Sequence, residues 1–314
     1  MGVEGNIVLL QKGFVGLLLS VVVGCGGGLP DLGKDGGPAG QDAGPDADAH
    51  AEAAPPPACN TSKPFAAPVA LAGADLVTGL DYAPSFSADE LTMWFSSARG
   101  TDASVSNVHI YMTTRSSLSS PFGPSTFVAA LNGPNNDSDP LLSPDGLTIY
   151  FQSDRIAGNN IGDIYVATRS SLGAPFVPPT LITIISSVGD DTQPALDADG
   201  ALWFARQITT SGYDLYRAAK GGSGFAVATE ETELNTPDDD WSPALSADGL
   251  TIFFASTRTG GSGSNDVWVA TRAALSSPFS AAQNVTELNT SYDELPHWLS
   301  PDGPGWRRDR LTPV

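Results

Sequence analysis

Acidic and basic side chains recur at fixed places along this sequence. An Asp-x-x-Pro motif occurs five times, at intervals of 56, 54, 49 and 53 residues, and its aspartates are Asp81, Asp137, Asp191, Asp240 and Asp293. Arginine recurs in step with the motif, as Arg99, Arg155, Arg206 and Arg258. Carboxylate and guanidinium groups form strong bidentate hydrogen bonds. The two columns therefore predict one Asp–Arg pair in each repeat, with the aspartate also capping its own turn.

A second interpretation of the same aspartates is a ring of carboxylates around a channel mouth, able to bind a cation or a basic partner segment. Further acids crowd this column, namely Asp139, Asp190, Asp238, Asp239 and Glu294. No cofactor is expected except, as a weak alternative, calcium, held by oxygen ligands. Its candidate ligands are Asp137, Asp139, Asp190, Asp191, Asp238 and Asp239.

Catalytic constellations have little support in this sequence. The three histidines, His50, His109 and His297, are scattered, and no G-x-S-x-G nucleophile motif occurs. A glycosidase needs two carboxylates at a defined separation, which spacing along a chain does not reveal. We therefore expect a non-enzymatic protein, and keep a glycan- or peptide-acting hydrolase that uses channel carboxylates as the alternative function.

The repeats that carry these columns predict an all-β chain. Each Asp-x-x-Pro is followed by a turn such as Ser-Pro-Asp-Gly at 143–146, where glycine accepts the positive φ of a hairpin. Aromatic strands follow in order, such as LTIYF at 147–151 and DIYVATR at 163–169, and each repeat closes with Pro-Phe or Gly-Phe. Four short strands in a unit of about 53 residues are typical of a β-propeller blade. The sequence thus predicts four complete four-stranded blades and a partial fifth.

These motifs resemble the TolB-type, WD-repeat-like propeller repeat, whose pattern is D-x-x-P, S-P-D-G, an apolar strand, S-x-R and D-[ILV]-[YW]. The resemblance covers residues 64–303 and recurs four to five times, so it implies a fold more specifically than a function. The small α/β domain that precedes the propeller in TolB, and the peptidase domain that follows related propellers, have no counterpart in this sequence.

The fifth blade has sequence signals for two strands only, an outer one at 64–72 and an inner one near 295–299. Pairing of the first and last strands would close the ring. Residues 304–314, PGWRRDRLTPV, stand where an apolar strand is due. We expect them to form an irregular tail, and favour a truncated or shifted reading frame over imperfect closure of the ring.

The N-terminal part is expected to contain a targeting signal followed by a flexible tether. Residues 14–23 form an apolar run of ten residues that ends at Gly24-Cys25, which resembles a bacterial lipobox with residues 1–24 as signal peptide and Cys25 as the lipidated residue. An ordinary secretory signal is the alternative. Residues 25–63 are rich in Gly, Pro, Asp and Ala and are expected to be a disordered tether.

The net charge of the chain excludes one class of function. The chain has 35 acidic and 15 basic residues and a net charge of -20, which rules out a nucleic-acid binder because such proteins need clustered cations. Together these features predict a lipid-anchored, non-catalytic module of the bacterial envelope, at the outer membrane and facing the periplasm or the cell surface. Its expected partner is an envelope protein, a peptide or a glycan, and a structural remnant without a partner is a third hypothesis.

Overall fold

The computed structural model describes residues 69–71, 81–99, 107–156, 161–207, 212–222 and 224–299, and the backbone of 7–12 and 17–22. Every regular element in these ranges is a β-strand, which confirms the all-β prediction. None of the described residues belongs to a helix that could cross a membrane. The predicted tether, the tail at 304–314 and Cys25 lie outside the described residues.

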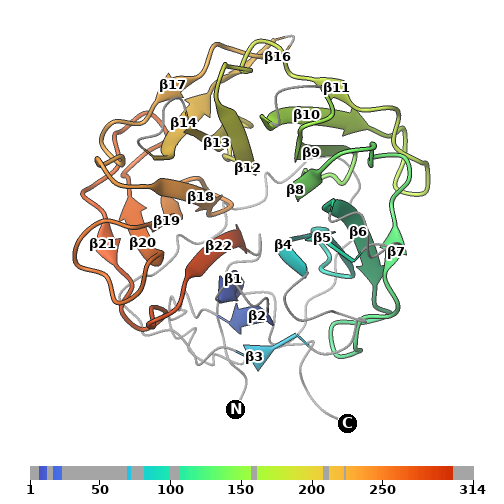
Figure 1. Cartoon of the computed structure of the whole chain (residues 1–314), viewed down its shortest axis with the longest axis horizontal. Helices are drawn as coiled ribbons and strands as arrows, with labels where there is room; N and C mark the ends of the chain where they lie inside the picture. Colours follow the sequence, from blue (N-terminus) through green and yellow to red (C-terminus); the bar gives the residue numbers. More distant parts are fainter. Residues whose placement is uncertain are drawn as a thin grey trace, which may run out of the picture.

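Five four-stranded antiparallel sheets stand around a common axis, which is the arrangement of a β-propeller (Figure 1). Blade 1 contains β4 (Asp81–Phe86), β5 (Thr92–Ser97), β6 (His109–Thr114) and β7 (Thr126–Phe127). Blade 2 contains β8 (Asp137–Leu142), β9 (Thr148–Ser153), β10 (Asp163–Thr168) and β11 (Thr180–Leu181). The first strand of each of these two blades is innermost and lines the axis (Figure 1).

Blades 3 and 4 repeat this order, and blade 3 has an additional hairpin. Blade 3 contains β12 (Asp190–Leu196), β13 (Leu202–Gln207), β14 (Asp214–Ala218) and β17 (Thr229–Glu230). Its hairpin pairs β15 (Lys220–Gly221) with β16 (Gly224–Phe225). Blade 4 contains β18 (Asp240–Leu245), β19 (Thr251–Ser256), β20 (Asp266–Thr271) and β21 (Gln283–Asn284). The four complete blades are therefore those predicted from the repeats.

Blade 5 is more complete than the sequence indicated. Its order is β22 (Glu294–Leu299), β1 (Ile7–Lys12), β2 (Leu17–Val22) and β3 (Val69–Ala70). The inner and outer strands are the two that were predicted. The two middle strands come from the stretch interpreted as a signal peptide, because an apolar run such as LLLSVV suits a strand as well as a leader. Cleavage before Cys25 would remove both, and the signal peptide stays a prediction.

Asp-Gly turns join the inner strand to the second strand in blades 2 to 4, and Asp89-Glu90 takes this place in blade 1. In blade 2, Gly146 has a φ of 70°, and Asp145 Oδ1 accepts hydrogen bonds from Ser143 Oγ at 2.5 Å and Leu147 N at 2.9 Å. The glycine accepts a backbone conformation that other residues rarely adopt. This turn therefore fixes the register between β8 and β9.

A bulge interrupts four of the inner strands at the same place. In blades 1 to 4, the residue before the proline of the Asp-x-x-Pro motif has a φ of 49° to 53°. These residues are Ala83, Asp139, Gln193 and Ser242. Each lies where the pairing register with the second strand shifts. The bulge turns the strand locally. It brings these residues and the prolines that follow to the narrow waist of the axial channel.

The core lies between blades rather than within one sheet. Phe176 of blade 2 packs edge-on against Trp94 of blade 1 at a centroid distance of 5.6 Å, and Phe279 of blade 4 packs against Trp203 of blade 3 at 5.8 Å. Six aromatic side chains of the second and third strands are buried. They are Trp94, Trp203, Trp268, Tyr111, Tyr165 and Tyr216. The closing Pro-Phe motif therefore provides the side chain that joins neighbouring blades.

Candidate functional site

Ion pairs join the two predicted columns within each of the four complete blades. Arg99 Nη2 lies 2.5 Å from Asp81 Oδ2, Arg155 Nη2 lies 2.5 Å from Asp137 Oδ1, and Arg206 Nε lies 2.6 Å from Asp191 Oδ1. Arg258 forms the same contact with Asp240. Each of these aspartates is buried. The pairs therefore belong to the interior of the blades.

The arginines of these pairs are also held by other groups. Arg155 Nη2 donates to the carbonyl of Leu131 at 2.7 Å, and its guanidinium carbon lies 4.7 Å from the centre of the Tyr165 ring. Arg258 Nη2 donates to the carbonyl of Leu234 at 2.6 Å. A guanidinium held by a carboxylate, a carbonyl and a ring has little capacity left for a ligand, so the column has a structural role.

Blade 5 departs from the predicted column by one residue. Asp240 Oδ2 accepts from Thr236 N at 2.6 Å, and the residue that makes the matching contact in blade 5 is Glu294, whose Oε2 accepts from Thr290 N at 2.9 Å. Asp293 instead accepts from Asn265 N at 3.0 Å. The Asp-x-x-Pro spacing pointed to Asp293 instead of Glu294 because blade 5 has one residue fewer between Thr290 and Pro296 than blade 4 has between Thr236 and Pro243.

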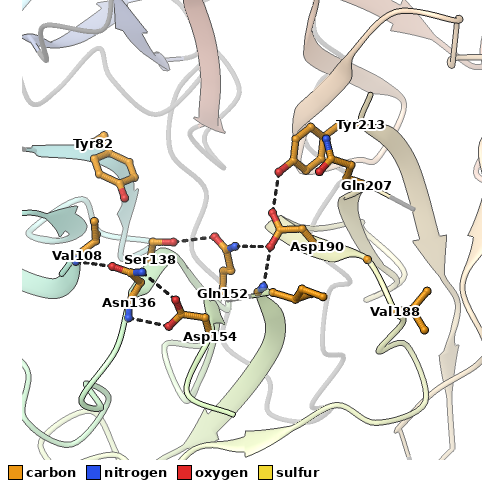
Figure 2. Close-up of a pocket in the computed structure, with 13 residues that line it drawn as sticks. Tyr82, Val108, Asn136, Ser138, Gln152, Asp154, Val188, Asp190, Gln207 and Tyr213 are labelled. Carbon is orange, nitrogen blue, oxygen red and sulfur yellow. Dashed lines mark hydrogen bonds between the residues drawn. The ribbon is translucent and has the colours of Figure 1, made fainter. Parts of the chain in front are cut away.

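A pocket of about 710 Å³ opens where the inner strands of blades 1 to 3 begin, and we call it the acidic pocket (Figure 2). Its polar lining comes from successive blades. It consists of Tyr82, Asn136, Ser138, Gln152, Asp154, Asp190, Gln207 and Tyr213. Apolar side chains of Val108, Ile161 and Val188 complete the wall, and Val188 is 81% exposed.

Gln152 links two sides of the acidic pocket (Figure 2). Its Oε1 accepts from Ser138 Oγ at 2.8 Å, and its Nε2 donates to Asp190 Oδ1 at 3.0 Å. Asp190 Oδ2 in turn accepts from Tyr213 OH at 2.7 Å. Burial and the neighbouring Asp190 raise the pKa of Tyr213, so its hydroxyl keeps its proton and donates to the carboxylate. The network fixes these side chains before any ligand arrives.

A second carboxylate lies on the opposite wall. Asp154 accepts from Asn136 N at 2.7 Å and from Asn136 Nδ2 at 2.8 Å. Neither Asp154 nor Asp190 forms an ion pair with any residue that the structure describes, and no described Lys or Arg lines the pocket. The acidic pocket therefore has two carboxylates that are hydrogen-bonded but not neutralised.

Asp139 lies deeper, at the waist of the channel. Its carboxylate accepts from Ser138 Oγ at 2.9 Å and Thr192 Oγ1 at 3.1 Å, and burial raises its pKa to about 6. Thr192 Oγ1 also donates to Gln152 Oε1 at 2.9 Å, so the hydrogen-bond networks of Asp139 and Asp190 meet.

The other acids of the calcium alternative have separate partners. Asp239 accepts from Tyr213 N, while Asp137 and Asp191 pair with arginines. Within the described ranges, no three His, Cys, Asp or Glu side chains are grouped so as to hold a metal ion.

Sequence reasoning missed a further repeated role of these residues. The residue before the aspartate column accepts a backbone N–H from the preceding blade: Asn136 from Val108 at 2.9 Å and Asp190 from Gly162 at 2.7 Å. Asp239 accepts from Tyr213 in the same way, at 2.8 Å. The signal was present, since four of the five repeats carry Asn or Asp directly before the column residue, with Asp293 before Glu294 in blade 5.

Trp241 of β18 and Trp298 of β22 have different surroundings. Trp241 is half-buried and stacks on Tyr213 at a centroid distance of 5.5 Å, beside the acidic pocket. Trp298 is buried against Phe86, with ring centres 5.1 Å apart.

Solved structures similar to this chain include TolB proteins. TolB from Acinetobacter baumannii has a TM-score of 0.48 and 17% identity over 75% of this chain and 49% of its own, so this chain spans about half of its length. A TolB from Agrobacterium tumefaciens has a TM-score of 0.49 and 16% identity, over 76% of each chain. An α-L-arabinofuranosidase from Lactobacillus brevis has a TM-score of 0.46 and 11% identity, over 65% of this chain and 72% of its own. No protein-family profile and no curated protein matches the sequence.

Proposed function

We propose that this chain is a non-catalytic recognition module that binds a basic segment of a partner protein or peptide in its acidic pocket. One observation carries the proposal: four of the ring aspartates are neutralised by arginine, whereas Asp154 and Asp190 face the pocket without a cation among the described residues. Negative charge concentrated in a concave site attracts and orients cationic groups.

The walls of the pocket suit such a ligand. The Tyr82 and Tyr213 rings lie at its edge, where an aromatic face stabilises a Lys or Arg side chain. Val188 and Ile161 offer apolar contact to the residues that flank the cation. A ligand with alternating basic and apolar side chains would use both kinds of surface.

The location of the module rests on its N-terminal sequence. The apolar run at 14–23 followed by Gly24-Cys25 supports a lipid anchor at Cys25 and residence in the bacterial cell envelope. Residues 25–63 would then hold the propeller away from the membrane surface. Outer-membrane attachment is part of this proposal.

Hydrolysis by channel carboxylates has weaker support. Asp139 has the raised pKa that a general acid needs. The waist around it has a volume of about 10 Å³, room for about one water molecule. Its carboxylate is also occupied by Ser138 and Thr192. A glycosidic or peptide bond could not reach Asp139 in this arrangement.

Fluorescence polarisation with labelled peptides tests the proposed function. The probe is a peptide of alternating arginine and valine, compared with the same peptide carrying glutamate in place of arginine. We expect saturable binding of the arginine peptide only, and an affinity that falls as salt rises because the contacts are ionic. Asp190→Asn and Asp154→Asn should each weaken binding about fivefold or more.

The matched control is Asp145→Asn, which removes the same charge from an exposed turn at the opposite end of blade 2 and should leave the affinity unchanged. Equal affinity for the two peptides would contradict the proposal. Binding of neutral oligosaccharides on a glycan array, without binding of the arginine peptide, would assign the pocket to a glycan instead.

A further inference from the structure

A second cavity, of about 270 Å³, lies at the other end of the axial channel, and we call it the apolar pocket. The course of β8 shows the relation between the two sites. Ser138 at its start lines the acidic pocket, Pro140 lines the waist, and Leu142 at its end lines the apolar pocket. The two pockets are therefore separated by the waist, which has room for about one water molecule.

All five inner strands contribute apolar side chains to this second cavity. One from each strand is Phe86, Leu142, Leu196, Leu245 and Trp298. Ala195 and Ala244 also line it, and their small side chains leave room on the side of blades 3 and 4. Ala198 and Ala247 lie in the exposed turns at its rim.

Two polar side chains in the wall, Asp197 and Ser246, are already paired. Asp197 Oδ2 accepts from Arg272 Nη2 at 2.6 Å and from Trp203 Nε1 at 3.2 Å. Ser246 Oγ donates to Asp248 Oδ1 at 2.5 Å. These groups therefore offer neither a free charge nor a free hydrogen-bonding atom to a ligand.

His297 lies between the waist and the apolar pocket. Its ring lines both the waist and the apolar pocket, and its Nε2 atom is inaccessible and has no hydrogen-bond partner among the described residues. Burial lowers the pKa of His297 to about 3, so the imidazole is uncharged at neutral pH. A charged ligand would lose its hydration here without gaining a partner.

We propose that the apolar pocket binds a small, uncharged aromatic molecule of one or two rings. The volume sets the size: an apolar cavity of about 150 Å³ holds benzene, and drug-sized ligands occupy about 300 to 1,000 Å³. The wall sets the charge: Asp197 and Ser246 are paired and His297 Nε2 is inaccessible, so the contacts that remain for a ligand are mainly apolar. This site is separate from the acidic pocket and its basic ligand.

Fluorine NMR on the full chain tests the inference with 5-fluoroindole as probe, which is uncharged and bicyclic. We expect saturable binding with a Kd below about 1 mM, a modest affinity for ten ligand atoms. The anionic analogue 5-fluoroindole-2-carboxylate should bind about tenfold more weakly or worse. Absence of saturation, or equal binding of the two compounds, would overturn the proposal.

Substitutions at the rim locate the binding site. Ala247→Trp and Ala198→Trp add a ring at exposed turns beside the cavity, and each should weaken 5-fluoroindole about tenfold without unfolding the chain, which circular dichroism checks. Ala281→Trp places the same side chain on an exposed outer segment of blade 4 and should change nothing. Asp190→Asn in the acidic pocket should also leave the Kd unchanged. Unchanged affinity in both rim variants would disprove this location.

Discussion

Arg206 holds Asp191 through two hydrogen bonds, from Nε at 2.6 Å and from Nη2 at 3.0 Å, but makes no such contact with Asp190, the residue before it. Two adjacent carboxylates thus have opposite surroundings. Asp191 is fully buried and neutralised inside its blade. Asp190 faces the acidic pocket and is held only by uncharged donors. The position along the strand therefore decides which acids build the propeller and which remain for a ligand.

Removal of one arginine from the repeated ion pairs should destabilise the fold strongly. Arg206→Ala leaves Asp191 buried without its cation, and breaking a buried pair in this way costs about 3 to 5 kcal/mol. Urea denaturation measures the loss. Asp199→Asn is the control, because Asp199 pairs with Arg217 at the surface and should cost less than about 1 kcal/mol. Similar losses in the two variants would contradict a structural role for the buried column.

Stability should depend on pH through Asp139. Its pKa is about 6 in the folded chain and about 3.9 when unfolded, so the folded state binds this proton more tightly. The stabilisation from Asp139 is therefore fully present below about pH 4 and is lost as the pH rises to 6. Asp139→Asn removes the buried charge, and should stabilise the chain relative to the parent by about 2 to 3 kcal/mol at pH 7.

The measurement is the free energy of unfolding of parent and variant at several pH values between 4 and 7. The difference between them isolates Asp139 from the other carboxyls, which titrate in both proteins. Parallel curves would show that Asp139 does not titrate in this range.

Local turn chemistry made the four complete blades predictable. Glycines such as Gly146 and Gly249 have φ values of 70° and 67°, and this requirement leaves an Asp-Gly signature in four of the five repeats, the first having Asp89-Glu90 instead. The Asp–Arg columns were also visible, because each pair lies within one blade at nearly constant spacing. Contacts made within each blade leave residues at a repeated spacing, and the sequence therefore predicts them.

The acidic pocket was less predictable because the residue types that line it change from blade to blade. Gln152, Asp190 and Tyr213 come from blades 2 and 3 and meet only across the border between them. The prediction of blade 5 was incomplete for a related reason. β1 and β22 lie almost 290 residues apart, and no local pattern specifies their pairing. Such contacts depend on closure of the ring rather than on spacing.

Removal of residues 1–24 should loosen the inner strand of blade 5. β1 pairs with β22 from Val8 opposite Leu299 to Lys12 opposite Glu294, so a chain that begins at Cys25 leaves this edge of β22 unpaired. We expect the amides of 294–299 to exchange about tenfold faster or more in the shortened chain, as measured by hydrogen exchange with mass spectrometry. Equal protection in the two chains would show that β22 does not depend on β1. Mass spectrometry of the N-terminus of the cellular protein shows which form exists.

The bulge in the inner strands should tolerate glycine but not a branched side chain. Ala83 has a φ of 49° and is buried, and this conformation costs a residue with a Cβ atom about 1 to 2 kcal/mol. Ala83→Gly relieves that cost but loses a buried methyl group worth about 0.8 kcal/mol, so the net change should stay within about 1 kcal/mol. Ala83→Val adds crowding at the same φ and should cost more than about 2 kcal/mol.

Chemical denaturation of the two variants gives the comparison. Ala88→Val, in the exposed turn that follows the same strand, is the matched control and should change stability by less than about 0.5 kcal/mol. A valine that is tolerated equally at both positions would contradict the strained conformation at Ala83. Because Asp139, Gln193 and Ser242 share this conformation, the same order of glycine above valine should hold in the other three blades.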